Sequence, residues 1–274
     1  MVSEVDLSLT DTHCHLDFEW FDKDRDQVVE RAREAGITRI LNPGIDLASS
    51  LAALDLAERY AEVFVAVGIH PNSASTFNQD SLPQLRELAS HPKVVAIGEI
   101  GLDYYRDRAP RDLQRHIFQL QLELAAESGL PVVIHNRQAT ADVLQLLSEW
   151  QSQLVIAGSV LAQRPGVLHS YSDNELNGRK AIERNFTIGI TGPVTFRNAP
   201  ELQRVVASLP VKQLLIETDA PFLTPHPLRG QRNEPALVRW VAEKIAELHS
   251  SSVSEIARQT SQNADRLFNW RVMD

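Results

Sequence analysis

Histidine and carboxylate side chains recur where short apolar segments of this sequence end. Imidazole nitrogens and carboxylate oxygens bind Zn²⁺, Mn²⁺, Co²⁺ or Ni²⁺, and an oxygen-richer shell completed by water admits Mg²⁺. Burying such groups together is costly unless something coordinates or neutralises them. If the fold brings them to one place, they can hold two divalent metal ions. The set comprises His13, His15, His70, Glu99, His135, His169 and Asp219.

The segment Thr10–Asp17, TDTHCHLD, places a histidine on each side of the only cysteine in the chain. A thiolate metal site, a redox cysteine and a pair of histidines aimed at one metal ion are the competing interpretations. Residues i and i+2 of a strand point to the same face, so His13 and His15 can share one ligand while Cys14 points away. A thiolate site normally recruits more cysteines. We therefore predict a packing role for Cys14.

Each of these residues also has an ordinary structural explanation when taken singly. His135 and His169 could be core histidines bonded to backbone groups, and Asp219 could cap a helix. Glu99 could cap a loop or pair with Arg106. Their joint occurrence at the ends of apolar segments favours the metal site.

Eight apolar segments of strand type alternate with amphipathic segments of helical spacing. The predicted strands are Leu7–His13, Ile37–Leu41, Val63–His70, Val94–Glu99, Pro131–His135, Gly166–Ser170, Phe186–Thr191 and Gln213–Asp219. The predicted helices are Asp24–Glu34, Leu47–Tyr60, Leu82–Ala89, Leu113–Ser128, Thr140–Trp150, Glu175–Arg184, Pro200–Ala207, Pro235–Leu248 and Val253–Phe268. Residues Gln151–Pro165 are interpreted as an insertion or an extra helix turn.

This alternation is typical of parallel strands joined by crossover helices. We predict an α/β fold, a (β/α)₈ TIM barrel forming a single domain over residues 1–274, with its site at the C-terminal ends of the strands. A doubly wound open sheet is the main alternative. The open sheet is disfavoured because no G-x-G-x-x-G or G-x-x-x-x-G-K-[ST] phosphate-binding loop follows the first strand.

Composition limits the possible classes. The net charge of -9 over 274 residues argues against a broad basic surface for nucleic acid. Bound metal would still supply local positive charge for a phosphate. The chain lacks an apolar run of about 18 residues and a basic, apolar leader, so we predict a cytoplasmic protein without membrane contact. No exposed heptad or apolar stripe is evident, which favours a monomer with no obligate protein partner.

Six motifs in order carry a resemblance to a known family. They read DTHCHLD, GIHP, AIGEIGLDYYRD, PVVIHNR, VLHSYS and LLIETDAPFLTP. At this order and spacing they resemble the TatD family of metal-dependent hydrolases, within the amidohydrolase-like superfamily, from Asp11 to near Phe268. The resemblance implies a metal-dependent phosphodiester hydrolase, a deoxyribonuclease of 3′-to-5′ exonuclease type acting on DNA ends, with RNA as the alternative substrate. The sequence HSYSDN departs from the family's usual Phe and Gly after the histidine, which leaves the substrate choice open.

The resemblance also implies roles for single residues. It assigns one divalent ion to His13, His15, Glu99 and Asp219, and a second to Glu99, His135 and His169, so that Glu99 bridges the two. The identity of the ions, Mg²⁺, Zn²⁺, Mn²⁺ or similar, stays open.

The catalytic roles are expected to belong to Asp219, Glu99 and His70. Asp219 would orient or deprotonate the attacking water. His70, as an imidazolium, and Arg137 would donate charge-assisted hydrogen bonds to the substrate phosphate. On the loop after Glu99, Tyr104 or Tyr105 could stack an unpaired base.

Two other functional classes remain open at this stage. The same ligands could serve a metal-dependent amide, ester or lactone hydrolase, because an activated water does not distinguish phosphorus from carbon. His70 and Arg137 favour the phosphodiester. A metal-binding protein without turnover is the third class, and the complete ligand set gives it no support.

Overall fold

Eight parallel strands form one sheet in chain order, and each strand pairs with the next along the sequence. The computed structural model describes residues 7–270. The strands are β1 Leu9–Asp11, β2 Ile37–Pro43, β3 Val63–Val67, β4 Val94–Asp103, β5 Val132–Arg137, β6 Gly166–Leu168, β7 Thr187–Ile190 and β8 Leu214–Ile216. Thr12 N–H donates to Ile216 O at 3.1 Å, and Cys14 forms an isolated parallel bridge with Ala220. These contacts join β1 to β8 and close the barrel.

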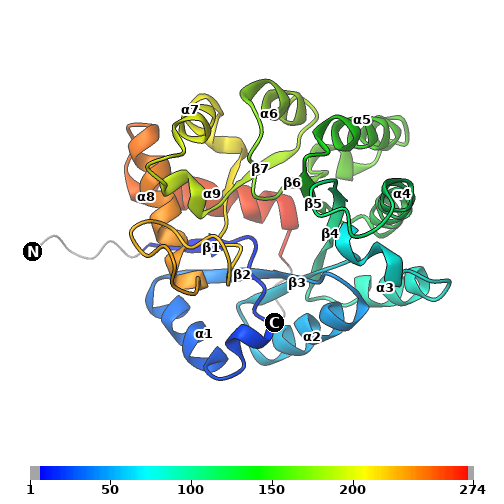
Figure 1. Cartoon of the computed structure of the whole chain (residues 1–274), viewed down its shortest axis with the longest axis horizontal. Helices are drawn as coiled ribbons and strands as arrows, with labels where there is room; N and C mark the ends of the chain where they lie inside the picture. The colour runs from blue at the N-terminus through cyan, green and yellow to red at the C-terminus, as the bar shows by residue number, and fades with distance from the viewer. Residues whose placement is uncertain (1–6, 271–274) are drawn as a thin grey trace, which may run out of the picture.

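Helices surround the strands (Figure 1). They are α1 Arg25–Glu34, α2 Leu47–Arg59, α3 Ser81–Ala89, α4 Arg111–Ser128, α5 Thr140–Ile156, α6 Glu175–Ile182, α7 Pro200–Ser208, α8 Val238–Leu248 and α9 Val253–Phe268. Ser252 caps the start of α9, because its Oγ accepts from Glu255 N–H at 3.1 Å. The predicted (β/α)₈ TIM barrel is confirmed.

An apolar cluster inside the barrel explains why the polar residues collect at one end. Val133, Val167 and Leu215 pack in one cluster with Leu267 and Phe268 of α9. Side chains two residues apart on a strand share a face. The residues two positions after Val133, Val167 and Leu215 therefore also point into the barrel, one layer nearer the C-terminal ends of the strands. They are His135, His169 and Glu217.

Several predicted boundaries were wrong. β3 ends at Val67, so His70 instead caps the 3₁₀ helix Pro71–Thr76. β4 continues past Glu99 because its pairing with β5 extends to Asp103 opposite Arg137. β1 and β8 are short, so the ligands predicted at their ends lie in the loops that follow, which are held by hydrogen bonds between the two loops.

The segment Gln151–Pro165 extends a helix. α5 continues to Ile156, and a 3₁₀ helix over Val160–Gln163 follows. The extra helical turns bury Leu154 and Leu161 in the core between barrel and helices. The expectation of an extra helix turn is confirmed.

No helix within residues 7–270 is both long enough and apolar enough to cross a bilayer. The cytoplasmic location and the monomeric state stay predictions. The single domain over residues 1–274 also stays one, because residues 1–6 and 271–274 lie outside the described part of the chain.

Candidate metal centre

The two histidines of the first motif converge on one point. His13 Nε2 and His15 Nε2 lie 3.3 Å apart, and both side chains are almost completely buried. Cys14 between them is fully buried in the hydrophobic core, as its predicted packing role requires. His13 and His15 are therefore placed to share one ligand.

Asp219 brings a carboxylate to the same point. Its Oδ1 lies 3.6 Å from His15 Nε2, 3.9 Å from His13 Nε2 and 3.8 Å from His169 Nε2. The residue is in the left-handed region, with φ +55°, which costs less for Asp than for most side chains. Its N–H donates to His13 O at 2.8 Å, so the backbone holds this conformation.

Glu99 lies between two groups of imidazoles and presents one oxygen to each. Its Oε2 is 3.4 Å from His13 Nε2 and 3.8 Å from His15 Nε2. Its Oε1 is 2.8 Å from His135 Nδ1 and 3.6 Å from His70 Nε2. This is the arrangement that a bridging carboxylate needs.

The structure brings all seven predicted residues together, in three overlapping groups whose donor atoms lie within 4.8 Å of one another. The groups are His13, His15 and Asp219; His13, Glu99 and His169; and His70, Glu99 and His135. Within residues 7–270, none of these groups contains both His135 and His169. His169 stacks on the His13 ring at 3.4 Å between centroids, whereas His135 packs edge to face with His70. The predicted division of ligands between two ions is untested and stays a prediction.

The protonation states of His13 and His15 suit a cation held between their Nε2 atoms. Within the described part of the chain, His13 Nδ1 and His15 Nδ1 are buried without a hydrogen-bond partner. Burial lowers the pKa of His15 to about 4 and that of His13 well below its usual value, so both rings are neutral, the form that binds metal. The neutral rings of His13 and His15, which converge on one point with the carboxylates of Asp219 and Glu99, fit a divalent ion.

Burial and neighbouring rings set the pKa values of the acids. Burial raises the pKa of Asp219 to about 7. Burial also opposes ionisation of Glu99, but the hydrogen bonds that it accepts from the His13 and His135 rings help to hold the pKa of Glu99 well below its ordinary value. In the metal-free protein Glu99 is therefore the anionic centre of the site, and Asp219 is the group that can take up a proton near neutral pH.

The predicted imidazolium state of His70 is wrong. Burial and then the nearby His135 lower its pKa to about 3, so it is not an imidazolium at neutral pH. Its Nδ1 accepts a hydrogen bond from Asn72 N–H at 3.0 Å, which puts the proton on Nε2. His70 is thus a neutral donor facing the site.

Two buried acids support the centre and were missed. Glu217 accepts hydrogen bonds from His169 Nδ1 and Ser170 N–H, both at 2.9 Å. Asp11 accepts from Thr218 Oγ1 at 2.6 Å, from Thr218 N–H at 2.9 Å and from His13 N–H at 3.2 Å. The sequence contains a pattern that could have predicted both acids, because each stands two residues before a candidate ligand.

Gly189 makes room for the Glu217 carboxylate. A Cβ at this position would lie 2.1 Å from Glu217 Oε1. Any side chain on β7 here would displace Glu217 and, with it, the hydrogen bond that orients His169.

The loop after Glu99 brings a further acid to the centre. Asp103 accepts from Arg106 N–H at 2.8 Å, and its Oδ2 lies 3.3 Å from His135 Nε2. Tyr104 is half-buried and donates through its hydroxyl to Asp142, and whether its ring stacks a base stays a prediction. Tyr105 is exposed, and the Arg137 guanidinium lies 4.0 Å from the centre of its ring.

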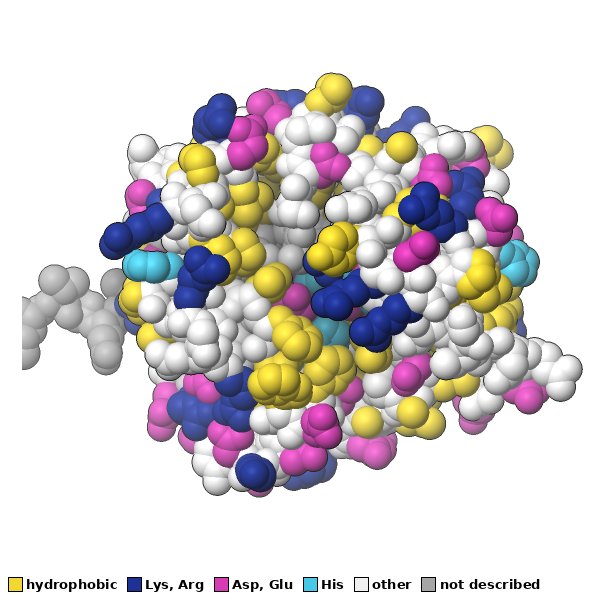
Figure 2. Space-filling model, in the orientation of Figure 1, with side chains coloured by type: hydrophobic (Ala, Val, Ile, Leu, Met, Phe, Trp, Pro, Cys, Tyr) yellow, Lys and Arg dark blue, Asp and Glu magenta, His cyan; other side chains and the backbone are white. Residues whose placement is uncertain are grey.

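The mouth of the barrel is hollowed, with histidine and acidic side chains at its base (Figure 2). Lys and Arg side chains line one side of the hollow, and hydrophobic side chains line the other. Arg137, at the end of β5, is exposed and belongs to the same end of the barrel as the candidate ligands. A phosphate over the metal centre would therefore meet cations on one side only.

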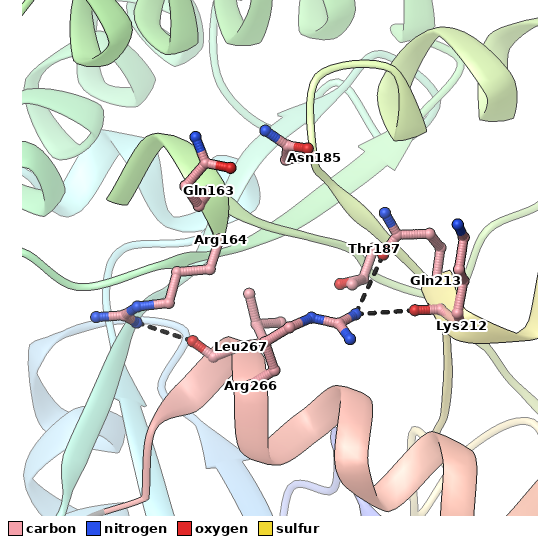
Figure 3. A pocket seen from close by; sticks show the side chains of 8 residues that line it. All are labelled: Gln163, Arg164, Asn185, Thr187, Lys212, Gln213, Arg266 and Leu267. Carbon is pink, nitrogen blue, oxygen red and sulfur yellow. Dashed lines mark hydrogen bonds between the residues drawn. The ribbon is translucent and has the colours of Figure 1, made fainter. Parts of the chain in front are cut away.

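A polar cavity of about 200 Å³ lies at the opposite end of the barrel (Figure 3). Thr187 begins β7 and Gln213 immediately precedes β8, so this cavity is at the N-terminal ends of the strands. Arg164 donates to Leu267 O and Arg266 to Lys212 O, both at 2.8 Å, which ties the end of α9 to the barrel. Its cations thus serve as structural anchors.

Residues 10–269 match the family described as TatD related DNase. The chain belongs to the TatD family. It is 44% identical over 260 residues to the uncharacterized metal-dependent hydrolase YabD of Bacillus subtilis, covering 95% of this chain and 98% of that protein. It is 40% identical over 254 residues to the 3′-5′ ssDNA/RNA exonuclease TatD of Cronobacter turicensis, covering 90% and 93%.

The fold agrees with that family. The crystal structure of YJJV, a TatD homologue from Escherichia coli K12, superposes with a TM-score of 0.88 at 32% identity, covering 97% of this chain and 99% of the other. The resemblance found in the six motifs is confirmed.

Proposed function

We propose that this TatD-family chain is a metal-dependent phosphodiester hydrolase that removes nucleotides from the 3′ ends of DNA or RNA. The observation that carries the proposal is the Glu99 carboxylate between two groups of imidazoles at the barrel mouth. A relative that is 40% identical over 254 residues is named a 3′-5′ ssDNA/RNA exonuclease, which supports this substrate class.

Two divalent ions fit this site. One would be held by His13, His15 and Asp219 together with Glu99, and the other by Glu99, His135 and His169. Such ions supply positive charge for the phosphoryl oxygens and lower the pKa of water from its bulk value toward ~7. Glu217, Asp11 and Asp103 hold the ligands in place through His169, His13 and His135.

The remaining steps belong to side chains of the chain. Asp219 orients the attacking water and accepts its proton at the carboxylate. His70 donates a hydrogen bond from its Nε2–H to a phosphate oxygen. Arg137 contributes a cation that is exposed at the same end of the barrel and can pair with a second phosphate oxygen.

The proposal is tested with chelator-stripped protein and 5′-labelled single-stranded DNA and RNA, with and without Mg²⁺, Mn²⁺ or Zn²⁺. We expect metal-dependent shortening one nucleotide at a time from the 3′ end, which a 5′ label displays as a ladder. The Glu99→Ala variant should give no ladder. Hydrolysis of an ester, lactone or amide by metal-loaded protein that leaves both nucleic acids intact would contradict the proposal.

The proton-accepting role of Asp219 has its own test. Asn is nearly isosteric but cannot accept the proton, so Asp219→Asn should lose turnover while its metal content, measured by atomic emission, stays close to that of the wild type. Near-normal turnover with metal bound would rule the role out.

A further inference from the structure

Three aromatic side chains form a continuous line from the candidate metal centre to the surface. Phe18 stacks on the ring of His15 with centroids 4.6 Å apart and planes 17° from parallel. Phe222 meets Phe18 edge to face at 6.1 Å, and Trp20 meets Phe222 edge to face at 6.4 Å. We call Phe18, Phe222 and Trp20 the aromatic ladder. Its inner end touches a candidate metal ligand.

The outer part of the ladder is open to solvent. Trp20 is 58% exposed and Phe222 is 44% exposed. Single exposed apolar side chains are common on protein surfaces, but contiguous ones beside a functional site mark binding surfaces. Hydrophobic side chains gather beside the histidines at the mouth (Figure 2). The ladder therefore offers a contact surface that the metal chemistry does not use.

Hydrogen bonds hold the backbone of each ladder residue. All three carbonyl oxygens accept a hydrogen bond from a side chain elsewhere in the chain, and Phe222 N–H also donates to Asp219 O at 2.8 Å. The donors are Arg25 Nη2 to Phe18 O at 3.2 Å, Arg232 Nη1 to Trp20 O at 2.7 Å and Asn233 Nδ2 to Phe222 O at 2.6 Å. A surface whose backbone is held before the ligand arrives loses less entropy on binding.

The position and chemistry of the ladder indicate which group binds to it. A group that contacts the ladder and reaches the metal centre must belong to the substrate, because the line of rings starts at His15. Aromatic rings stack on nucleobases of every sequence, since each base has a π-face. In a duplex both faces of an internal base are covered, whereas the successive bases of a single strand can each turn a face to the rings. Arg137 ends β5, four strands away from β1 around the barrel, so a phosphate backbone can lie on the side of the mouth opposite the ladder.

We propose that the aromatic ladder stacks the unpaired bases next to the phosphodiester that is cleaved, and so directs the enzyme to single-stranded ends. The proposal rests on the proposed function and deepens it by naming the side chains that contact the bases of the substrate. Phe18, nearest to the metal centre, would contact the terminal base. Trp20 and Phe222 would contact the bases that precede it.

The test compares Trp20→Ala with the wild type on two single-stranded oligonucleotides, one normal and one with abasic sites at its last three positions. We expect kcat/KM on the normal strand to fall roughly 5- to 100-fold, the range for one lost base stack. The abasic strand should be cleaved equally by both proteins. Trp20→Phe should restore most of the loss. Trp240→Ala, which removes an exposed tryptophan on α8, is the matched control and should behave like the wild type.

Other results would overturn the proposal. An equal loss on both strands would mean that Trp20 acts on the fold of the loop, and no loss on either would mean that no base contacts it. If sedimentation showed that the wild type is a dimer and Trp20→Ala a monomer, the ladder would be an interface between copies of the chain.

A binding measurement separates this proposal from the proposed function. Fluorescence anisotropy of a labelled single strand is followed in chelator, where no cleavage occurs. One outcome is that the wild type binds the normal strand more tightly than Trp20→Ala does and yet fails to cleave it when metal is added. That result would support base stacking by the ladder and contradict the proposed nuclease function. Equal binding by the two proteins would contradict the ladder whatever the activity.

Discussion

Cations at the N-terminal ends of the strands and the donor atoms at the barrel mouth differ in how their polar atoms are partnered. Just before β4, Lys93 is largely buried and its Nζ donates to Ala61 O at 2.7 Å and to Val63 O at 3.1 Å. Near β6, Arg164 donates to Leu267 O. At the mouth, by contrast, His13 and His15 aim their Nε2 atoms at each other.

The difference separates stability from function. A buried cation bonded to backbone oxygens has partners for its charge and stabilises the fold. Converging imidazoles and carboxylates cost stability in the metal-free chain, and proteins keep such groups where function requires them. Substitutions at the two ends should therefore separate activity from stability.

The largest effect is expected for Glu99→Gln. This change keeps the shape but removes the charge that both groups of imidazoles face, so kcat/KM should fall by at least about 10³-fold, equivalent to ~4 kcal/mol. The assay is single-strand cleavage at saturating metal, together with metal content per chain. Glu123→Gln, on the exposed face of α4, is the control. Full metal content with full activity would contradict the assignment.

Metal addition should stabilise only a chain with an intact mouth. At a metal concentration of ~100 times Kd, an ion that binds only the folded state adds about 2.7 kcal/mol to the free energy of unfolding. Thermal unfolding of chelator-stripped protein, with and without Zn²⁺ or Mn²⁺, measures this. Arg266→Ala, at the opposite end, should gain as much Tm as the wild type. Glu99→Gln should gain less, and an equal gain would place the metal elsewhere.

Glu217→Gln tests the orientation of His169. Removing the acid that accepts from the imidazole of a metal ligand typically lowers metal affinity about 10- to 100-fold. Calorimetric titration with metal measures the change directly. Gly189→Ala, which would push on the same carboxylate, should lower the affinity in the same direction. A Kd within twofold of the wild type for both variants would mean that His169 needs no orienting acid.

The smallest effect is expected for Lys93→Met. Its hydrogen bonds to carbonyl oxygens would be lost, so the free energy of unfolding should fall by about 1.5 kcal/mol. Urea unfolding measures this, and kcat/KM per folded molecule should not change. A loss of activity with unchanged stability would contradict the assignment of stability to the N-terminal ends of the strands and of function to the mouth.

Much of the site was predictable because of how the barrel is built. In a (β/α)₈ barrel the C-terminal ends of all strands meet, so a polar residue after each apolar segment is directed to one mouth. His135 and His169 follow Val133 and Val167 by two positions and could be placed in this way. The same alternation would have found Glu217 and Asp11, had it been applied to the acids two residues before the ligands.

Contacts between residues of different segments were not predictable from the local sequence pattern. β4 continues past Glu99 because β5 supplies hydrogen-bond partners, and the neutral state of His70 follows from its burial beside His135. The hydroxyl of Tyr104 donates to Asp142 of α5, a partner that no local pattern indicates. Each of these features depends on a contact between segments far apart in the chain.

The sequence by itself determined the family, the order of strands and helices and the seven donors of the candidate centre, because alternation and motif spacing are local properties. The tertiary structure decided which donors share a group, which acids support them and which aromatic rings line the mouth. Those outcomes depend on distances across the barrel. Only the closure of β8 against β1, with Asp219 N–H bonded to His13 O, brings the first and last motifs together.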